Sequence, residues 1–323
     1  MTDRPSWSRV FVETAARLHF GVLDLAGLSG RSFGGIGAAA PAPTLQLSAR
    51  PAPTLTVVGA DAERAEGFAR AFIAYHRLDA GADVSIERVL PPHAGLGSGT
   101  QLALAVARAL AELLGLPTAS AHLALAVGRA QRSAVGTWTF DGGGFVVEGG
   151  RRAGCDGVAP LIARLPFPPA WRCIVAVPRG APALSGADEA AALAALPPPP
   201  RGEAERIAHL VLMSLLPALA DADIAAFGRA LTEIQTTTGG WFASVQGGAF
   251  AQGPSAELIR RMAEWGAPGV GQSSWGPAVY GIVDGADSAS RFADNVRVLL
   301  DRCGGGDVYE GPFRTDGARV WRS

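Results

Sequence analysis

Lysine is absent from this sequence, so all 28 of its basic residues are arginine. A protein without lysine cannot contain a Walker-type phosphate loop, whose lysine contacts the nucleotide phosphates, and it cannot form a Schiff base with a carbonyl substrate. Any phosphate or carboxylate that needs a cationic side chain must therefore bind arginine, whose planar guanidinium donates paired hydrogen bonds to such anions.

Cysteines and long apolar runs are also scarce. The three cysteines, Cys155, Cys173 and Cys303, lie far apart and are odd in number, which argues against a disulfide framework and against a thiolate metal site. The longest apolar stretch, 102–116, is interrupted by two charged residues and is too short to cross a bilayer. Residues 1–5 lack the apolar run of a signal peptide, so we expect a cytoplasmic protein.

Neither sign of charge dominates the chain. The formal net charge is -1, with 18% charged and 48% hydrophobic residues. This balance is typical of a soluble globular protein and gives no reason to expect binding to nucleic acid or to a membrane. At 323 residues the chain is long enough for two domains, each with its own core.

Proline marks the clearest break in the pattern. Residues 178–200 are proline-rich and end in four consecutive prolines, which cannot continue a helix. Periodicity predicts an α+β protein of two lobes, with domains at 1–168 and 169–323. The expected strands are 11–14, 44–48, 55–58, 84–89, 144–148, 172–177, 278–283 and 308–311, and the expected helices are 61–78, 101–114, 119–130, 203–219, 222–238, 255–265 and 286–302.

Residues 91–110, PPHAGLGSGTQLALAVARAL, place three glycines at alternate positions directly before an apolar helix. Gly115 supplies the C-terminal end of that helix. Because free backbone N–H groups and the helix dipole at an N-terminus both favour an anion, the arrangement indicates an anion-binding loop. A plain tight turn would also account for the glycines.

The stretch P-x-x-x-G-L-G-S-G-T (91–100) resembles the second motif of the GHMP kinase superfamily, in which the loop wraps phosphates. The other two motifs of that superfamily resemble ARLHFGVLDLAGLSGRSFGGIGAAA (16–40) and GVGQSSWGPAVYGIV (269–283). The residue patterns of these motifs, together with FDGGGFVVEGG (140–150) and ALSGADE (183–189), resemble those of one branch of the superfamily, the β-ribofuranosylaminobenzene 5'-phosphate synthases. The resemblance implies a two-lobed GHMP-kinase-like fold, with a β-rich N-terminal lobe carrying helices and a ferredoxin-like α/β C-terminal lobe.

This chain departs from the superfamily pattern at two places. Gly99 stands where the kinases usually have a second serine. Residues 133–136 read Ser-Ala-Val-Gly where archaeal members of the branch tend to read S-G-I-G, which leaves the role of Ser133 open.

The synthase family joins phosphoribosyl diphosphate to 4-hydroxybenzoate or 4-aminobenzoate and releases carbon dioxide and diphosphate, as a step of methanopterin biosynthesis. The resemblance therefore implies a pentosyltransferase that acts on small molecules. It also implies Mg²⁺, held mainly by the diphosphate, so that no metal motif need be visible in the sequence. A homodimer is a further expectation.

The resemblance also implies roles for individual residues. The anion cradle would consist of Gly95, Leu96, Gly97, Ser98, Gly99, Thr100 and Gln101, with further backbone donors at Gly35 and Gly37. The catalytic candidates are Arg17, His19 and Asp24, where His19 or Asp24 would polarise the para substituent or orient the metal. The substrate-binding candidates are Arg31, Arg132, Gln272, Ser273, Ser274, Trp275 and Gly276, and Trp275 or Trp138 would stack on the benzoate ring.

Structural alternatives stay open for several of these residues. His19 could be a core histidine, Asp24 could cap the LAGLSG turn, and Trp275 could fill a core. Glu148 and Glu189 are further candidates for metal or ribose contact.

Two other functions stay open as well. One is an ATP-dependent small-molecule kinase of the same superfamily, and the other is a ligand-binding protein that has the fold but no catalysis. The missing lysine and the lack of an S-G-x-D stretch after the second motif argue against the kinase.

Overall fold

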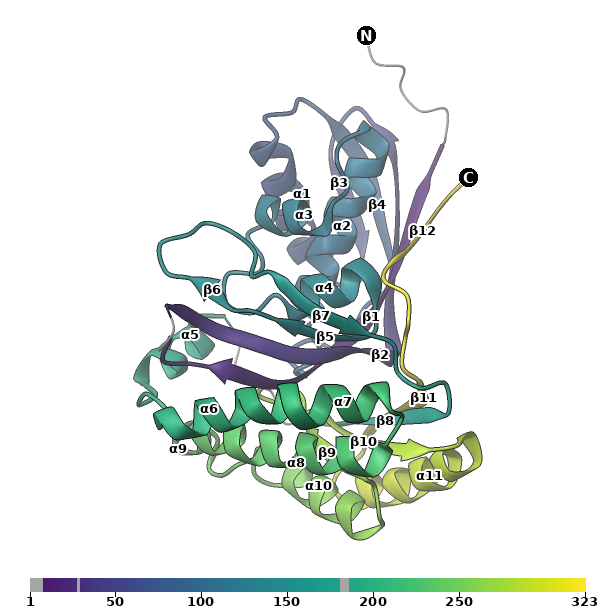
Figure 1. The fold of residues 1–323 in the computed structure, drawn as a ribbon. Helices are drawn as coiled ribbons and strands as arrows, with labels where there is room; N and C mark the ends of the chain where they lie inside the picture. The colour runs from purple at the N-terminus through teal and green to yellow at the C-terminus, as the bar shows by residue number, and fades with distance from the viewer. Residues whose placement is uncertain (1–7, 28–29, 181–185) are drawn as a thin grey trace.

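Two long strands form the framework of the N-terminal lobe. The computed structural model describes residues 8–27, 30–180 and 186–323; residues 28–29 of the first motif and 183–185 of the ALSGADE stretch lie outside them (Figure 1). Strand β1 (Val10–Asp24) pairs antiparallel with β2 (Arg31–Ala52). Buried and partly exposed side chains alternate along residues 10–18 of β1, whereas residues 34–40 of β2 are all buried. Most of the first motif (16–40) therefore lies on two paired strands.

The rest of this sheet forms around β2. Its second half pairs with β4 (Gly81–Arg88), which pairs in parallel with β3 (Thr56–Gly59). Its first half pairs with β5 (Phe145–Glu148), and β5 pairs with β7 (Leu161–Leu165). The short β6 (Arg151–Arg152) also pairs with β2.

Helices cover one face of this sheet, as Figure 1 shows. The central helix is α2 (Ser98–Leu114), which contacts both β1 and β2 and is buried along most of its length. Around it lie α1 (Ala62–Tyr75), α3 (Ser120–Ala126) and α4 (Val135–Gly142). The apolar period that predicted a helix at 101–114 reflects this burial.

The C-terminal lobe contains an antiparallel sheet in the order β11-β8-β10-β9. Its strands are β8 (Trp171–Pro178), β9 (Gly269–Gln272), β10 (Val279–Asp284) and β11 (Gly306–Pro312). Helices fall between β8 and β9 and between β10 and β11, so the lobe has the split βαβ order of a ferredoxin-like fold. This part of the predicted fold class is confirmed.

The helices of this lobe pack on its sheet and against the first lobe. They are α5 (Gly186–Ala195), α6 (Arg201–Leu210), α7 (Leu216–Ala220), α8 (Ile224–Trp241), α9 (Ala243–Gln246), α10 (Pro254–Glu264) and α11 (Ala286–Arg302). A π-helical turn, Val211–Leu215, joins α6 to α7, so the helix predicted at 203–219 is continuous but not uniformly α-helical. Among the described residues, none of the helices is both long and apolar enough to cross a membrane.

Some elements differ from the sequence prediction. Helix α5 lies inside the proline-rich stretch 178–200, because the run GADEAAALAA is free of proline and rich in good helix formers. The short α4 and β9 were also not predicted, since each contains glycine. Strand β12 (Arg319–Arg322) returns to the first lobe and pairs with β1, which a single boundary at 168/169 does not anticipate.

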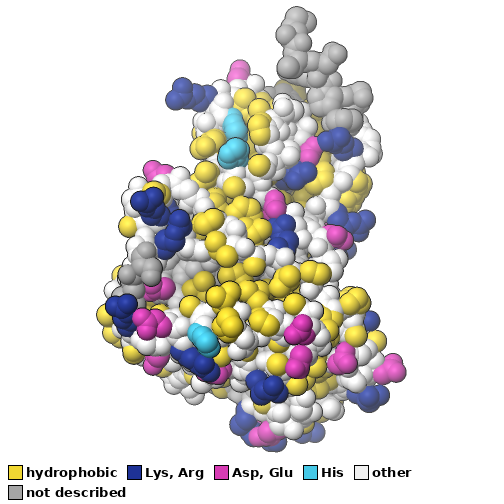
Figure 2. All heavy atoms as spheres, viewed as in Figure 1, with side chains coloured by type: hydrophobic (Ala, Val, Ile, Leu, Met, Phe, Trp, Pro, Cys, Tyr) yellow, Lys and Arg dark blue, Asp and Glu magenta, His cyan; other side chains and the backbone are white. Residues whose placement is uncertain are grey.

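Hydrophobic side chains gather across the middle of the face in Figure 2, where the lobes meet. Among the large hydrophobic side chains of the described residues, Ile162 of β7 and Leu212 and Met213 of the π-helical turn are each more than half exposed.

Candidate active site

The glycine loop has the backbone geometry that only glycine adopts easily. Gly95 and Gly97 have φ values of +76° and +74°, and Gly97 is the N-cap of α2. A Cβ atom at Gly95 would lie 2.2 Å from the carbonyl oxygen of Ser273, so the loop packs backbone against backbone there. The loop is thereby fixed at the N-terminus of a buried helix.

The three sequence motifs meet at this loop. The Ser273 hydroxyl donates to the Gly95 carbonyl at 2.7 Å and accepts the backbone N–H of His19 at 3.0 Å. Arg17 Nη1 also donates to the Gly95 carbonyl, at 2.6 Å, and the Arg17 backbone N–H donates to Leu96. Residues that lie far apart in sequence are therefore held in one hydrogen-bonded cluster at the junction of the lobes.

An arginine-rich cavity opens in front of the loop. Arg17, Arg64 and Arg129 line it, together with Gly95, Gly97, Ser98, Gly99 and Thr100. A Cβ atom at Gly99 would lie 2.8 Å from Arg64 Nη2 and 3.2 Å from Arg129 Nη2. The two guanidinium groups thus occupy the space beside Gly99 that a serine would need.

Positive charge exceeds negative charge in this arginine cavity. Arg64 has one acidic partner, Asp61 at 2.8 Å, whereas Arg129 Nε is buried without a partner among the described residues. Burial and the neighbouring Arg64 lower the pKa of Arg129. Two guanidinium groups this close, beside a helix N-terminus, favour an anion of high charge.

Sequence reasoning missed Arg64 and Arg129. Arg64 lies on α1 and Arg129 lies just after α3, so neither is near a glycine motif in the chain. Only the packing of α1 and α3 beside α2 brings them to the loop.

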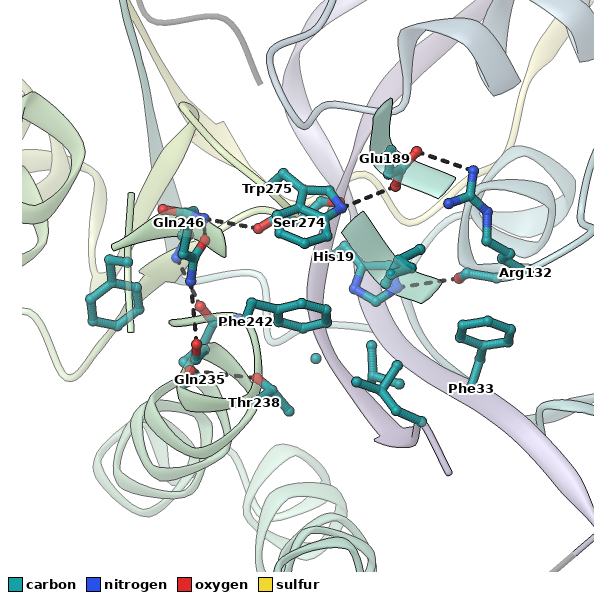
Figure 3. A pocket seen from close by; sticks show the side chains of 18 of the residues that line it. His19, Phe33, Arg132, Glu189, Gln235, Thr238, Phe242, Gln246, Ser274 and Trp275 are labelled. Atoms are coloured by element: carbon teal, nitrogen blue, oxygen red, sulfur yellow. Dashed lines mark hydrogen bonds and ion pairs between the residues drawn. The ribbon is translucent and has the colours of Figure 1, made fainter. Parts of the chain in front are cut away.

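A second cavity adjoins the first, and we call it the aromatic cavity because four aromatic side chains contribute to its walls (Figure 3). Phe33, Phe242, Phe250 and Trp275 line it, and the Phe242 and Trp275 rings meet edge to face with centroids 4.8 Å apart. Such walls suit a flat aromatic ligand. The cavity also contains Gln272 of the third motif, whose side chain bonds Gln246, Ser274 and Ala251.

Arg132 supplies a cationic group to the aromatic cavity. Its Nη2 lies 3.2 Å from Glu189 Oε2, and its Nη1 is buried without a partner among the described residues. Glu189 Oε1 accepts a hydrogen bond from Trp275 Nε1 at 3.1 Å. Figure 3 shows these three side chains around one space. The unpaired Nη1 can donate to a ligand carboxylate.

The two cavities share four lining residues, Arg17, Glu189, Ser274 and Trp275. Burial lowers the pKa of Arg17 to about 10, against the opposing charge of Glu189, so Arg17 stays cationic at neutral pH. A ligand that fills both cavities would therefore pass between a guanidinium and a carboxylate.

His19 on β1 is buried and also lines the aromatic cavity. Its Nε2 lies 3.2 Å from the Ser133 hydroxyl. Burial, with the nearby charge of Arg17, lowers its pKa to about 3. The imidazole is therefore neutral at physiological pH and can accept a proton or a hydrogen bond.

Several candidate residues lie outside both cavities and stabilise the fold around them. Asp24 Oδ1 accepts the backbone N–H groups of Ala26 and Gly27, both at 2.9 Å, which is the turn-capping alternative. Arg31 Nη1 donates to the Gly150 carbonyl at 3.0 Å. Trp138 Nε1 donates to the Ala159 carbonyl.

Five more candidates have packing roles. The buried Gln101 side chain bonds Thr14 and Gly136 instead of facing the arginine cavity. Gly35 and Gly37 allow close packing, since Cβ atoms there would lie 2.7 Å and 2.6 Å from Val135. The carbonyl of Gly276 lies against Gly95, and Leu96 is buried.

The described residues contain no group of three or more histidine, cysteine, aspartate or glutamate side chains that could hold a metal ion. Glu148 is fully buried behind the aromatic cavity, which removes it as a direct metal or ribose contact.

Comparisons with known proteins give a consistent result. The GHMP kinases N terminal domain family matches residues 63–143. The chain is 34% identical to the beta-ribofuranosylphenol 5'-phosphate synthase of Methanothermobacter thermautotrophicus over 297 residues, covering 85% of this chain and 89% of the relative. It is 35% identical to the Archaeoglobus fulgidus enzyme of the same name over 286 residues, covering 84% and 87%.

Solved structures match in fold. Homoserine kinase from Cytophaga hutchinsonii superimposes with a TM-score of 0.73 at 17% identity, covering 99% of this chain and all of that one. At this identity the match shows the fold alone, and it confirms the predicted GHMP-kinase-like class.

Proposed function

The chain belongs to the beta-ribofuranosylphenol 5'-phosphate synthase family and is therefore an enzyme, and from this premise we propose its reaction. It joins phosphoribosyl diphosphate to 4-hydroxybenzoate or 4-aminobenzoate, and it releases diphosphate and carbon dioxide. Its place would be in methanopterin biosynthesis.

The observation that carries the proposal is the pair of adjoining cavities with complementary chemistry. One has a glycine loop and three arginines, and the other has aromatic walls and a guanidinium nitrogen without a partner. The proposed substrates match these two cavities: phosphoribosyl diphosphate is a highly charged anion, and a benzoate is a flat ring with one carboxylate. The anomeric carbon and the ring would meet where Arg17 and Glu189 line both cavities.

The diphosphate would bind at the arginine cavity. The free backbone N–H groups at the start of α2 and the guanidiniums of Arg64 and Arg129 would neutralise it as it leaves. Mg²⁺ would be held mainly by diphosphate oxygens, with the Ser98 and Thr100 hydroxyls as the protein groups that line the same space. The ion would supply further charge neutralisation for the leaving group.

The benzoate would bind in the aromatic cavity with its carboxylate on Arg132 Nη1, near the junction. Arg17 and His19 project from the same face of β1 and are separated by about 6.6 Å along the strand, a length close to that of a benzene ring with two para substituents. With the carboxylate at the junction, the para substituent would therefore reach His19.

The bonds then change in a balanced sequence. The bond from the anomeric carbon to diphosphate breaks, and the ring carbon that bears the carboxylate forms the new bond to that carbon. Positive charge develops on the sugar near the Glu189 carboxylate, as in glycoside chemistry. The carboxylate leaves as carbon dioxide, and its bonding electrons restore the aromatic ring.

Carboxyl-labelled substrate tests the proposal directly. We expect purified protein with Mg²⁺ and phosphoribosyl diphosphate to release labelled carbon dioxide from 4-hydroxybenzoate or 4-aminobenzoate, and to release none when phosphoribosyl diphosphate is omitted. Absence of release from both benzoates would overturn the proposal, and phosphate transfer from labelled ATP to an alcohol would favour a kinase.

A variant pair links this activity to the arginine cavity. Arg129→Gln should raise the KM for phosphoribosyl diphosphate at least about tenfold, because hydrogen bonds to charged groups contribute about 1.5–3 kcal/mol. The control, Arg70→Gln, removes an exposed arginine of α1 that pairs with Glu66, and it should leave KM unchanged.

A further inference from the structure

Two polar side chains that line the aromatic cavity, His19 and Ser133, lie next to a fully buried carboxylate, Glu148. His19 Nε2 lies 3.2 Å from Ser133 Oγ. Ser133 Oγ in turn lies near Glu148 Oε1, since a Cβ atom at Gly35 would be 3.2 Å from the first oxygen and 2.9 Å from the second. Glu148 has no exposed surface, and its carboxylate accepts the backbone N–H groups of Gly150 at 2.8 Å and Ala134 at 3.3 Å. A buried carboxylate needs such donors, yet neither these two N–H groups nor the Ser133 hydroxyl carries a positive charge.

The Ser133 hydroxyl has one hydrogen and two lone pairs, and its hydrogen bonds determine where the protons lie among the three side chains. One lone pair of the hydroxyl accepts the Val135 N–H at 3.3 Å. An ionised Glu148 can only accept, so the single hydroxyl hydrogen points to it. The remaining lone pair must accept from His19, so the ring proton is on Nε2. Nδ1 then carries a lone pair, and it has no partner among the described residues.

We propose that His19, Ser133 and Glu148 form a proton relay that takes the proton of the para hydroxyl or amino group of the benzoate and later returns it. His19 is the residue that touches the substrate, and Ser133 and Glu148 act through it as positioning residues. The inference rests on the proposed function, because that reaction creates a strongly acidic para substituent.

The proton moves in one direction and then back. As the ring carbon attacks the sugar, the para O–H or N–H gives its proton to Nδ1, Nε2–H passes to Ser133, and the Ser133 hydrogen passes to Glu148. The ring is then a cyclohexadienone or its imine, with no net charge at the para position. Loss of carbon dioxide sends an electron pair through the ring to the para atom, which takes the proton back from Nδ1.

Charged side chains on the elements around Glu148 bond to other groups. Arg17 bonds Gly95, Arg31 bonds Gly150, Arg132 bonds Glu189, Arg151 bonds Gln131 and Cys155, Arg164 bonds Asp141, and Arg152 is exposed. Burial therefore dominates and raises the pKa of Glu148 to about 7, despite its hydrogen bonds. The carboxylate can take up a proton near physiological pH.

The first test is the pH profile of turnover with 4-aminobenzoate and 4-hydroxybenzoate. In the unmodified protein kcat should fall below about pH 7, as Glu148 becomes protonated. We call this fall the acidic limb of the pH profile. Glu148→Gln should abolish the limb near pH 7 and lower kcat about 100-fold or more, since general base catalysis accelerates a reaction about 10²–10⁴-fold. Ser133→Ala should do the same. The substrate's 5-phosphate, with a pKa near 6, titrates in every variant and cancels in the comparison.

A matched control is Glu13→Gln. Glu13 is a mostly buried carboxylate on β1 that pairs with Arg88 and lies outside both cavities, so its loss should keep the limb near pH 7. If Glu148→Gln retains the limb, or lowers kcat equally at all pH values with the limb in place, the relay is overturned and Glu148 has a structural role only.

The second test needs no turnover. Nitrogen-15 NMR distinguishes the two tautomers of His19, whose signal is assigned by its loss in His19→Gln. Above pH 7 the proton should be on Nε2. Below pH 7, and in Glu148→Gln at every pH, the group at 148 can donate to Ser133, which then donates to Nε2, so the ring proton should move to Nδ1. A proton on Nδ1 throughout would overturn the relay.

The two tests separate the relay from the proposed function. If the tautomer behaves as predicted but neither benzoate releases carbon dioxide, the proposed reaction fails and the hydrogen-bond direction stands. If carbon dioxide is released but Glu148→Gln changes neither the His19 tautomer nor the limb near pH 7, the proposed reaction stands and the relay fails.

Discussion

Gly99 occupies the second position of α2, where the guanidiniums of Arg64 and Arg129 fill the space beside its Cα. Its φ is not positive, so an L side chain is compatible with the backbone there. The residue is glycine because of its neighbours: the tips of two flexible arginines would have to move away from a Cβ atom.

Gly99→Ala should therefore separate stability from binding. We expect the melting temperature to stay equal or rise, because alanine favours a helix by up to about 1 kcal/mol over glycine. The KM for phosphoribosyl diphosphate should rise about tenfold as the arginines are displaced. Gly67→Ala on α1, with nothing within 4 Å of its Cβ position, should stabilise the protein without changing KM. Equal KM values in both variants would contradict this role for Gly99.

His19 and Glu148 should give opposite pH dependences of stability. Burial lowers the pKa of His19 to about 3, so folding resists its protonation and loses stability as the pH falls below 6.5. Burial raises the pKa of Glu148 from 4.5 to about 7, so folding resists its ionisation and loses stability as the pH rises through that range.

Each substitution should remove one of these dependences. Relative to the unmodified protein, His19→Gln should gain about 1.4 kcal/mol of unfolding free energy per pH unit as the pH falls from 6.5 toward 3, and Glu148→Gln should gain as much per unit as it rises from 4.5 to 7. Urea unfolding at several pH values measures both slopes. Slopes of the same sign would show that one environment has been misassigned.

At the scale of elements, helix α5 brings the one acidic side chain that lines both cavities within the described residues. Glu189 bonds Trp275 of the third motif and Arg132 of the segment before α4. The sequence left Glu189 among the further candidates, because a helix inside a proline-rich stretch gave no reason to place it at a junction of two lobes.

Glu189→Gln should lower kcat at least about tenfold, because the developing positive charge on the sugar loses its nearby carboxylate. The KM for benzoate should stay equal or fall, since Arg132 loses its competing ion pair. Steady-state kinetics with the control Glu205→Gln, an exposed residue of α6, measures both parameters. Unchanged kcat would exclude a role for this carboxylate in the chemical step.

The elements that could be predicted are those whose chemistry is local. Glycines at alternate positions before a helical repeat of apolar residues indicated the loop and α2, and the residue patterns of the three motifs indicated the two-lobed fold. Arg64, Phe242 and Glu148 could not be placed, because each reaches the site through contacts between distant elements. In the sequence, Glu148 on its four-residue strand cannot be distinguished from any other polar residue in a short strand.

At the scale of the whole molecule, Ser273 joins the lobes. Its buried hydroxyl bonds Gly95 of the glycine loop and His19 of β1, while Ser273 itself follows β9 in the other lobe. The next residues in the chain, Ser274 and Trp275, line both cavities, so the relative placement of the lobes sets the geometry of the site.

Ser273→Ala should lower the free energy of unfolding by about 1–3 kcal/mol, the usual cost of leaving buried hydrogen-bonding groups without a partner. Ser290→Ala, an exposed position on α11, should change it little. Urea denaturation compares the two variants. Equal stability would mean that the lobes are held together by other contacts.

The most direct measurement is a crystal structure with diphosphate, Mg²⁺ and 4-hydroxybenzoate bound together. The account predicts diphosphate oxygens within hydrogen-bond distance of the backbone N–H groups at residues 97–99 and of Arg64 or Arg129. It also predicts the benzoate carboxylate on Arg132 and the para hydroxyl on His19 Nδ1. A diphosphate bound away from residues 95–100 would contradict it.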